Sequence, residues 1–377
     1  MSKLRQPYLQ TRRDAWVEVN LGAIEHNISA MLRLCNEKTK FLAVVKADAY
    51  GHGSTMAAPT LLASGVDVLG VASVDEGIEL RNSGVSAPIL VLGTAPSWSV
   101  ASAVENDLEL SIFTQEHLTA CVNTFEHLKI KPKVHIKIDT GMHRIGLTYK
   151  EASSFINKVI STKEVELRSI FSHLACAEDE IISEMQFSNF EPIREEFPFI
   201  PAHILNSAGI MSYQGKQFDM VRSGIAIYGL MPDLSSNVNS VPSLKPAMSL
   251  KARIVHLKEI ESDLGVSYGY SYKTDHNPTK IATIPVGYAD GVSRALSNKI
   301  YGLINGKKVK QIGNITMDQM MFDVSDVENV HIGDVVTLIG TDGVNTIFID
   351  EWAKLLNTIN YELTCRLKAR LPRVYSR

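Results

Sequence analysis

"FLAVVKADAYGHG", residues 41–53, contains the feature on which the interpretation of the chain depends. An apolar run typical of a buried strand ends on Lys46, although lysine is among the side chains least often buried. An aspartate, a tyrosine, a histidine and two glycines follow within seven residues. A lysine kept at the end of such a strand indicates covalent chemistry at this position, with the binding of an anion as the simpler alternative.

Short apolar runs alternate with helical patterns over most of the chain before residue 230. Residues 20–38 repeat apolar side chains on one helical face, and residues 73–84 begin with a serine cap and acids in the first turn. Strands that alternate with helices predict a parallel sheet, and eight such units predict a closed (β/α)8 barrel. An open doubly wound sheet is the alternative, but no G-x-G-x-x-G motif follows the first run. The eight runs are residues 41–46, 68–73, 88–93, 108–113, 133–139, 167–173, 202–206 and 219–224.

The pattern changes after a Ser-, Pro- and Asn-rich linker that begins near residue 230. Strand-like runs follow, with an Asn-Gly hairpin signal at Asn305-Gly306 and one helical pattern at residues 348–359. The fold class predicted is therefore α/β plus all-β, with a TIM barrel over residues 1–240 and an antiparallel β domain over residues 245–377. The strand-like segment at about residues 14–20 is expected to pair with the C-terminal domain.

The composition excludes several classes of partner. The chain has 377 residues and a formal net charge of -3, so it offers no basic field for nucleic acid or anionic lipid. The basic runs "KIKPKVHIK" and "NGKKVK" are interpreted as a solvated strand rim or hairpin. No apolar stretch is long enough to span a bilayer, and no signal peptide is recognised. The four cysteines are far apart in sequence, so no metal site is expected and a reduced, cytoplasmic protein is predicted.

Two loops predict a phosphate site. The loops after strands seven and eight of such a barrel commonly bind phosphate, and here they read "NSAG" (206–209) and "RSGIAIYG" (222–229). They offer the hydroxyl of Ser207 and the backbone N–H groups around Gly224 and Ile225. Strand one neighbours strand eight in a closed barrel, so the amine of Lys46 would face the phosphate. This arrangement suggests a Schiff base with pyridoxal 5′-phosphate (PLP), although a sugar-phosphate enzyme without a cofactor would also fit.

The motif "AVVKADAYGHG" closely resembles the signature of the alanine racemases, which are fold-type III PLP enzymes. The resemblance covers essentially the whole chain, because further motifs match in the same order. The resemblance implies a barrel followed by a β domain, and a head-to-tail homodimer in which the C-terminal domain completes the partner's active site. These motifs are "HIKIDTGMHRIG", "FSHLACAED", "HILNSAG", "VRSGIAIYGL", "VSYGYSY", "IPVGYADGVSR", "GNITMDQMM" and "INYELTC".

The resemblance also implies roles for single residues. Lys46 would form the Schiff base and serve as one catalytic base, and Tyr268 from the other subunit would serve as the second. Arg144 and Met317 would contact the substrate. The cofactor would be held by Lys46, Tyr50, His173, Ser207, Arg222, Gly224, Ile225 and Tyr361. The lysine that matches Lys137 is carbamylated in some members. Tyr288, Glu178 and Arg294 would lie at the entrance.

Arg222 indicates the type of reaction. Beside the pyridine nitrogen, a guanidinium can donate a hydrogen bond but is a very poor proton donor. The ring then remains a weaker electron sink than one that faces a carboxylate. A short-lived carbanion favours rapid reprotonation and suppresses transamination.

The predicted function is racemisation of L- and D-alanine, which supplies D-alanine for peptidoglycan. A serine or broad-specificity racemase on the same scaffold is an alternative. Thr316, Asn314 and Glu178 depart from the commoner family pattern and put the selectivity of the entrance in question. A non-catalytic PLP-binding protein is a further alternative, but such proteins generally lack a C-terminal domain and so lack Tyr268.

Overall fold

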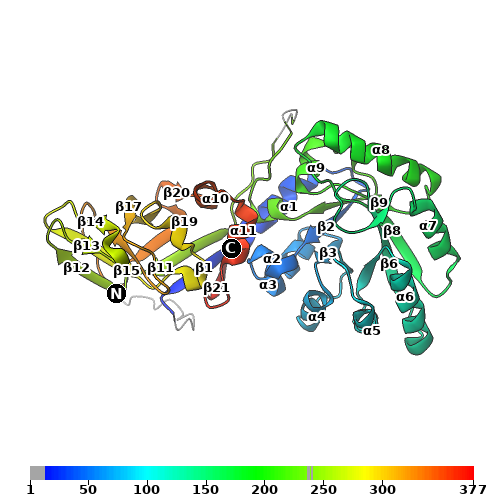
Figure 1. The fold of residues 1–377 in the computed structure, drawn as a ribbon, viewed down its shortest axis with the longest axis horizontal. Helices are drawn as coiled ribbons and strands as arrows, with labels where there is room; N and C mark the ends of the chain where they lie inside the picture. The colour runs from blue at the N-terminus through cyan, green and yellow to red at the C-terminus, as the bar shows by residue number, and fades with distance from the viewer. Residues whose placement is uncertain (1–12, 236–237, 239–240) are drawn as a thin grey trace, which may run out of the picture. The chain divides into compact units, whose positions relative to one another are not determined.

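The computed structural model describes residues 13–235, 238 and 241–377. The chain divides into two compact units, which Figure 1 shows as a ribbon. One unit comprises Gly22–Lys245, and the other comprises Pro246–Arg377 together with the N-terminal segment that ends at Leu21.

The first unit is built on eight parallel strands in the order β10-β2-β3-β4-β5-β6-β8-β9. The sheet closes because the N–H of Asp219 donates to the carbonyl of Ala202 and that of Arg222 donates to the carbonyl of Leu205. The predicted (β/α)8 barrel is thus confirmed. The strands are β2 (Lys40–Val44), β3 (Val68–Val71), β4 (Ile89–Val91), β5 (Glu109–Ile112), β6 (Lys133–Asp139), β8 (Glu166–Phe171), β9 (Ala202–His203) and β10 (Met220–Ser223), with the short β7 (Leu147–Thr148) beside β6.

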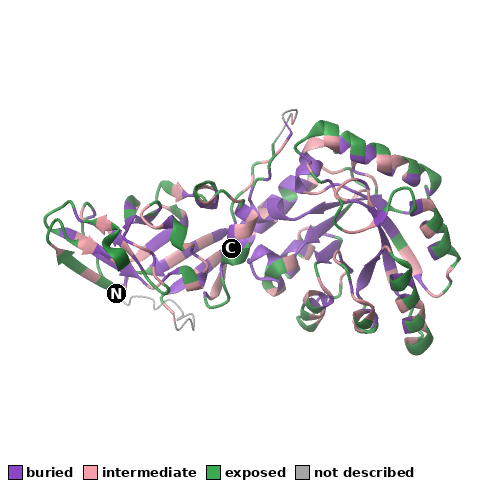
Figure 2. Cartoon of the chain, viewed as in Figure 1, coloured by how far each residue is buried: buried purple, intermediate pink, exposed green. Residues whose placement is uncertain are grey.

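The barrel strands form because both of their faces are buried. All residues of β3, β4, β5 and β10 are buried, as expected of strands covered by helices, and Figure 2 shows the strands buried and the outer faces of the helices exposed. Among the described residues of this unit, four helices begin at side-chain caps, in which Ser73, Thr114, Asp179 and Asn206 accept backbone N–H bonds. The helices are α1 (Leu21–Leu32), α2 (Lys46–Tyr50), α3 (Ser54–Ala63), α4 (Val74–Asn82), α5 (Val100–Glu105), α6 (Gln115–Leu128), α7 (Ala152–Ser161), α8 (Glu180–Glu196) and α9 (Ser207–Ser212).

The second unit contains a mostly antiparallel sheet in the order β12-β15-β18-β17-β16-β19-β11-β1-β21, with β20 beside β19. The predicted hairpin is confirmed: β16 and β17 pair around Asn305 and Gly306, whose φ angles of 51° and 73° suit a type I′ turn. The strands are β1 (Ala15–Asn20), β11 (Met248–Arg253), β12 (His256–Ile260), β13 (Gly265–Val266), β14 (Tyr272–Lys273), β15 (Thr279–Ile284), β16 (Tyr301–Ile304), β17 (Lys307–Ile312), β18 (Met320–Asp323), β19 (Val335–Asp342), β20 (Asn345–Ile347) and β21 (Arg373–Ser376).

The structure differs from the sequence-based expectations in three places. β1 pairs with β11 in antiparallel fashion but with β21 in parallel, so the sheet is not wholly antiparallel. A second helix, α11 (Asn360–Arg366), follows the expected α10 (Ile349–Leu356). β2 ends at Val44, so Lys46 lies two residues beyond the strand rather than on its last position.

Among the described residues, no helix has both the length and the apolarity needed to cross a membrane.

Candidate active site

Lys46 begins a turn with an uncommon backbone. Ala47, Asp48 and Ala49 have φ and ψ angles near +50°, and Tyr50 has a φ of 54°. The short α2 is therefore left-handed over these four residues. Each L-residue in this conformation costs roughly 1–2 kcal/mol, so the surroundings must hold the turn in place.

Two carboxylates hold this turn. The carboxylate of Glu76 accepts the backbone N–H of Ala47 through Oε1 and that of Ala72 through Oε2, each at 2.7 Å. Asp48 accepts the N–H of Ser54, also at 2.7 Å. Hydrogen bonds from several backbone N–H groups to a carboxylate are among the stronger ones in proteins, so they offset the strain. The sequence analysis did not identify Glu76, which it treated only as a helix-end acid.

The pairing of β2 with β10 places this turn beside the predicted phosphate loops. A Cβ built on Gly224 would lie 2.4 Å from the hydroxyl oxygen of Tyr50, so a larger residue there would displace the Tyr50 ring. The hydroxyl of Ser207 accepts the N–H of Gly224 at 2.9 Å and lies 3.1 Å from the hydroxyl of Ser223. Tyr50, Ser207, Gly224 and the buried Ile225 therefore gather at one rim of the barrel.

Arg222 is only 3% exposed and is surrounded by acceptors. Its Nη2 donates to the carbonyls of Ser172 (2.7 Å) and Ile204 (3.0 Å) and to Nδ1 of His173 (3.1 Å). Its Nη1 donates to Nδ1 of His203 at 2.5 Å. The nearby Asp219 does not pair with it and instead accepts the N–H of Ala202. His173 was expected at the site from its sequence motif, whereas His203 was not.

The positive charges at this rim of the barrel lower the pKa values of neighbouring basic side chains and so favour their neutral forms. Burial lowers the pKa of Lys137 well below its usual value, and the charges of Arg222 and Arg144 lower it further against the opposing effect of Asp139. The pKa of His173 is lowered well below its usual value by burial and then by Arg222, Lys137, Arg144 and Lys46. The exposed Arg144 and the amine of Lys46 thus act on the same group of side chains.

A neutral, buried amine is the form of lysine that reacts with carbon dioxide. Carbamylation of Lys137 therefore stays a prediction. Native mass spectrometry of the intact protein tests this prediction. A carbamate on Lys137 would raise the mass by that of one carbon dioxide, whereas an unmodified chain would have the mass calculated from its sequence.

The prediction that the two basic runs lie in solvent is confirmed for one run and wrong for part of the other. Lys307, Lys308 and Lys310 are exposed on the β16–β17 hairpin, as expected for "NGKKVK". His135 and Lys137, in contrast, are almost fully buried inside the barrel, so the prediction of a solvated rim is wrong for this part of "KIKPKVHIK". Alternate residues of β6 point inward, and in this barrel the interior carries polar groups.

The remaining predicted residues of the second unit gather on neighbouring loops. The N–H groups of Tyr288 and Ala289 donate to the carbonyls of Thr316 and Met317, and the side chain of Asn314 donates to the carbonyl of Tyr268. Tyr268 is 76% exposed and Met317 is 54% exposed, so both side chains are available for contact. A cavity of about 760 Å³ in this unit is lined by Tyr268 and Thr316 among others.

Three predicted residues lie outside these contacts. Arg294 is exposed at the start of a single 3-10 turn, and Tyr361 is half-buried on α11. Glu178 is exposed in the first unit, one residue before the cap of α8.

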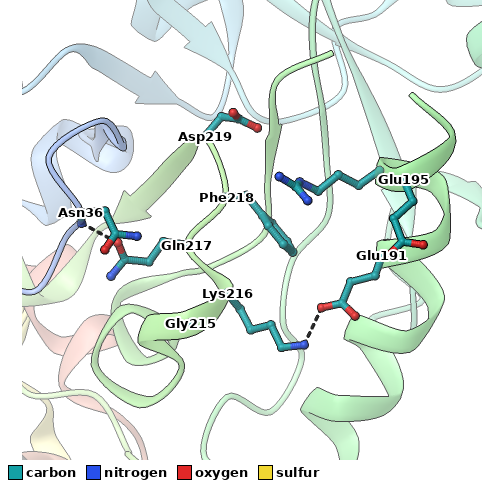
Figure 3. A pocket seen from close by; sticks show the side chains of 9 residues that line it. Asn36, Glu191, Glu195, Gly215, Lys216, Gln217, Phe218 and Asp219 are labelled. Atoms are coloured by element: carbon teal, nitrogen blue, oxygen red, sulfur yellow. Dashed lines mark hydrogen bonds and ion pairs between the residues drawn. The ribbon is translucent and has the colours of Figure 1, made fainter. Parts of the chain in front are cut away.

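A separate pocket lies at the opposite, amino-terminal end of the barrel. It has a volume of about 480 Å³ and is lined by residues before β10 and by the end of α8, as Figure 3 shows. Lys216 pairs with Glu191 at 2.5 Å in this pocket, and Arg194 lies over the ring of Phe218. Because Lys46 follows the carboxyl end of β2, this pocket is not part of the candidate site.

Known families match both units. Residues 19–232 match the family description "Alanine racemase, N-terminal domain", and residues 247–375 match "Alanine racemase, C-terminal domain". The chain belongs to the alanine racemase family. Relatives include "Alanine racemase 2" of Oceanobacillus iheyensis, which is 41% identical over 97% of this chain and 94% of its own, and the alanine racemase of Methanococcus maripaludis, 41% identical over 96% and 98%.

Solved alanine racemase structures share the whole fold. The structure from E. faecalis superposes with a TM-score of 0.91 at 34% identity and covers 97% of this chain and 99% of its own. That from Bacillus anthracis, with bound L-Ala-P, has a TM-score of 0.88 at 36% identity and covers 97% and 95%. These matches extend over both units, so the racemase family accounts for the C-terminal sheet as well as the barrel.

Two histidines, the buried His203 and the partly buried His173, predict a pH dependence of stability. Burial, followed by the charge of Arg222, lowers the pKa of both His173 and His203 well below 6.5, so the native chain holds them neutral. The unfolded chain binds protons on them as the pH falls below about 6.5. Stability should therefore be fully present above this pH and decrease below it, by up to about 1.4 kcal/mol per pH unit for each histidine.

Urea unfolding at fixed protein concentration, repeated across this pH range, measures the effect. His203→Gln should lower the overall stability but flatten the slope, whereas His331→Gln, at a position whose side chain is 74% exposed, should leave the slope unchanged. An unchanged slope in His203→Gln would contradict the assignment of a neutral, buried His203.

Proposed function

We propose that the protein interconverts L- and D-alanine with PLP bound at the carboxyl end of the barrel. The observation that carries the proposal is the placement of Lys46, in a strained turn, beside the cluster of Tyr50, Ser207 and Gly224. A lysine next to an anion site and near a buried arginine is the arrangement that a covalently held, phosphate-bearing aldehyde requires. Membership of the alanine racemase family supports the same conclusion.

The residues present fit PLP. The hydroxyls of Ser207 and Tyr50 and the backbone N–H groups around Gly224 and Ile225 suit its phosphate, and the missing side chain of Gly224 lets the Tyr50 hydroxyl lie against this loop. Among the described residues, the Nε–H of Arg222 has no acceptor, so it remains available to a ring nitrogen. His173 would lie against the ring, and Tyr361 would contribute to holding the phosphate.

When bound, PLP supplies an electron-withdrawing ring that stabilises negative charge at the α-carbon of the amino acid. Lys46 would hold the cofactor and would then move a proton on one face of that carbon. Tyr268 of the partner subunit would move a proton on the opposite face. Two bases avoid the need for a single base to turn over or exchange its proton between the two transfers.

Arg222 orients and limits this chemistry. Burial lowers the pKa of its guanidinium to about 9, so it stays charged at neutral pH. A charged guanidinium donates a hydrogen bond but gives up its proton poorly. Arg222 would therefore favour fast return of the proton over transfer of the amino group.

The substrate would be small. The exposed Arg144 is suited to bind a carboxylate, and the tyrosines at 268 and 288 together with Met317 would restrict the space. The Bacillus anthracis racemase binds L-Ala-P, which is consistent with an alanine-sized site in that protein. Thr316 and Asn314 bear on the choice between alanine and serine, and relative turnover of the two amino acids tests it.

Racemisation is tested by chiral analysis after incubation of the purified protein with PLP and L-alanine. D-alanine should accumulate to an equal mixture. Lys46→Ala should lower the rate by roughly a hundredfold or more, since a base and the covalent attachment are both lost. Lys40→Ala, at the exposed start of β2, the strand that precedes Lys46, is the matched control and should keep the rate. Absence of D-alanine, with PLP bound at Lys46, would indicate a PLP-binding protein without catalysis.

We also propose that the active enzyme is a head-to-tail homodimer in which Tyr268 and Met317 act on the partner's barrel. Mixing denatured and refolded Lys46→Ala and Tyr268→Phe chains tests this. If the sites are shared, each mixed dimer contains one site with both bases, and statistical mixing should restore about a quarter of the wild-type rate.

The outcome separates the two arrangements. If each chain used its own Tyr268, every site in the mixture would lack one base and no activity would return.

An active racemase would supply D-alanine for peptidoglycan, and a strain that lacks the gene should then require D-alanine for growth. Growth without it would remove that biosynthetic role.

A further inference from the structure

A chain of buried polar side chains leads from Arg222 through the barrel interior to Glu109. The guanidinium Nη1 of Arg222 lies 2.5 Å from Nδ1 of His203, and Nε2 of His203 lies 2.9 Å from the hydroxyl of Ser169. That hydroxyl lies 2.6 Å from Nδ1 of His135, whose Nε2 lies 2.8 Å from the carboxylate of Glu109. All five residues are buried, with Glu109 the most accessible at 7%.

The chemistry of the donors fixes one direction for this chain. A guanidinium is only a donor, so Nδ1 of His203 must accept. A neutral imidazole carries one N–H, so that of His203 is on Nε2 and donates to Ser169. The single hydroxyl proton of Ser169 is then donated to Nδ1 of His135, and Nε2–H of His135 donates to Glu109. Every proton in the chain thus points from Arg222 toward Glu109.

The alternative protonation leaves a group without its partner. If His135 carried two protons, its Nδ1–H would donate to Ser169, which already accepts from His203. The hydroxyl proton of Ser169 would then have no acceptor within the chain, and an unmade hydrogen bond in a buried site costs free energy. The ring of Phe171 stacks on that of His203 at 4.9 Å and 5°, so the orientation of His203 is also fixed.

The two ends of the chain carry opposite charges. Burial by itself raises the pKa of Glu109, but the hydrogen bond from His135 and its Coulombic effect, followed by the charges of Arg168 and Lys133, lower it below its usual value. Glu109 is therefore ionised at neutral pH, as is Arg222. Each hydrogen bond in such a chain polarises the next, so the carboxylate makes His203 a stronger acceptor for Arg222.

We propose that Glu109, His135 and Ser169 act through His203 as positioning residues that weaken Arg222 as a proton donor. The inference rests on the proposed function. The stronger His203 binds Nη1 of Arg222, the more positive charge is drawn toward the barrel interior. The Nε–H of Arg222 then donates less strongly to the nitrogen of the cofactor ring. Glu109, at the other end of the chain of hydrogen bonds, would in this way keep the ring a weak electron sink.

Breaking the chain should change the balance between two reactions of the holoenzyme. In the side reaction, alanine is oxidised to pyruvate and the aldehyde cofactor is reduced to its amine form, with no further reactant. Glu109→Gln and Ser169→Ala should each raise the ratio of this transamination to racemisation by roughly tenfold. The KM for alanine should change little, and the absorption band of the bound cofactor should shift.

Two further variants separate this role from a structural one. Ser169→Thr keeps a hydroxyl and should restore the wild-type ratio and spectrum. Glu166→Gln makes the same chemical change as Glu109→Gln at a half-buried residue that pairs with Arg168, and it should have no effect. Lower thermal stability with an unchanged ratio and an unchanged band in Glu109→Gln and Ser169→Ala would overturn the proposal.

Nitrogen-15 NMR of the labelled histidines tests the chain without turnover. His203 and His135 should both appear as neutral Nε2–H tautomers in the holoenzyme, and Ser169→Ala should perturb both. A doubly protonated His135 would overturn the proposal. The NMR experiment also tests the hydrogen-bond chain separately from the proposed function. A protein with the predicted tautomers but no racemisation would refute only the proposed function.

Discussion

The pairing of β2 with β10 is the constraint on which the candidate site depends. Leu42 lies opposite Arg222 and Ala43 opposite Ser223, so both strands reach the same rim of the barrel. The turn that carries Lys46 therefore meets the loop at Gly224, where the hydroxyl of Tyr50 occupies the space that a side chain would need. Without the pairing of β2 with β10, these two strands would lie at opposite edges of an open sheet, and the amine would be separated from the predicted phosphate loops.

The structure stores strain where the chemistry is proposed and offsets it with charged acceptors. Four successive left-handed residues follow Lys46, and the carboxylates of Glu76 and Asp48 accept backbone N–H groups around them. The barrel interior differs, because the buried charge of Arg222 is stabilised by neutral carbonyls and imidazoles rather than by a direct ion pair. Arranged in this way, cations can face an anionic ligand without being neutralised by an adjacent acid.

The sequence predicted the features that depend on local pattern. Eight short apolar runs, a serine cap at residue 73 and the Asn305-Gly306 turn are each determined by neighbouring residues, and each was found. The left-handed turn could not be predicted, because the alanines of "KADAY" favour a right-handed helix and the distant Glu76 decides otherwise. The parallel contact of β1 with β21 joins the two ends of the chain and leaves no local signal.

The interior chain from Arg222 to Glu109 was missed for a related reason. Polar residues on barrel strands look the same in sequence whether they face solvent or one another, and His135 was assigned to a solvated rim. Only the alignment of β5, β6, β8 and β9 shows that these side chains meet inside the barrel. The site residues named from family motifs fall into two groups, one in each unit. Motif order thus identified the residues but not the contacts that each of them makes.

Borohydride reduction of the purified protein with PLP, followed by peptide mapping, tests the central claim most directly. A single phosphopyridoxyl group should be fixed on Lys46. That label should be lost in Gly224→Ala, because the added methyl group would occupy the position of the Tyr50 hydroxyl. Label on another lysine, or full labelling of Gly224→Ala, would contradict the claim that Lys46 faces a phosphate cradle built on Gly224.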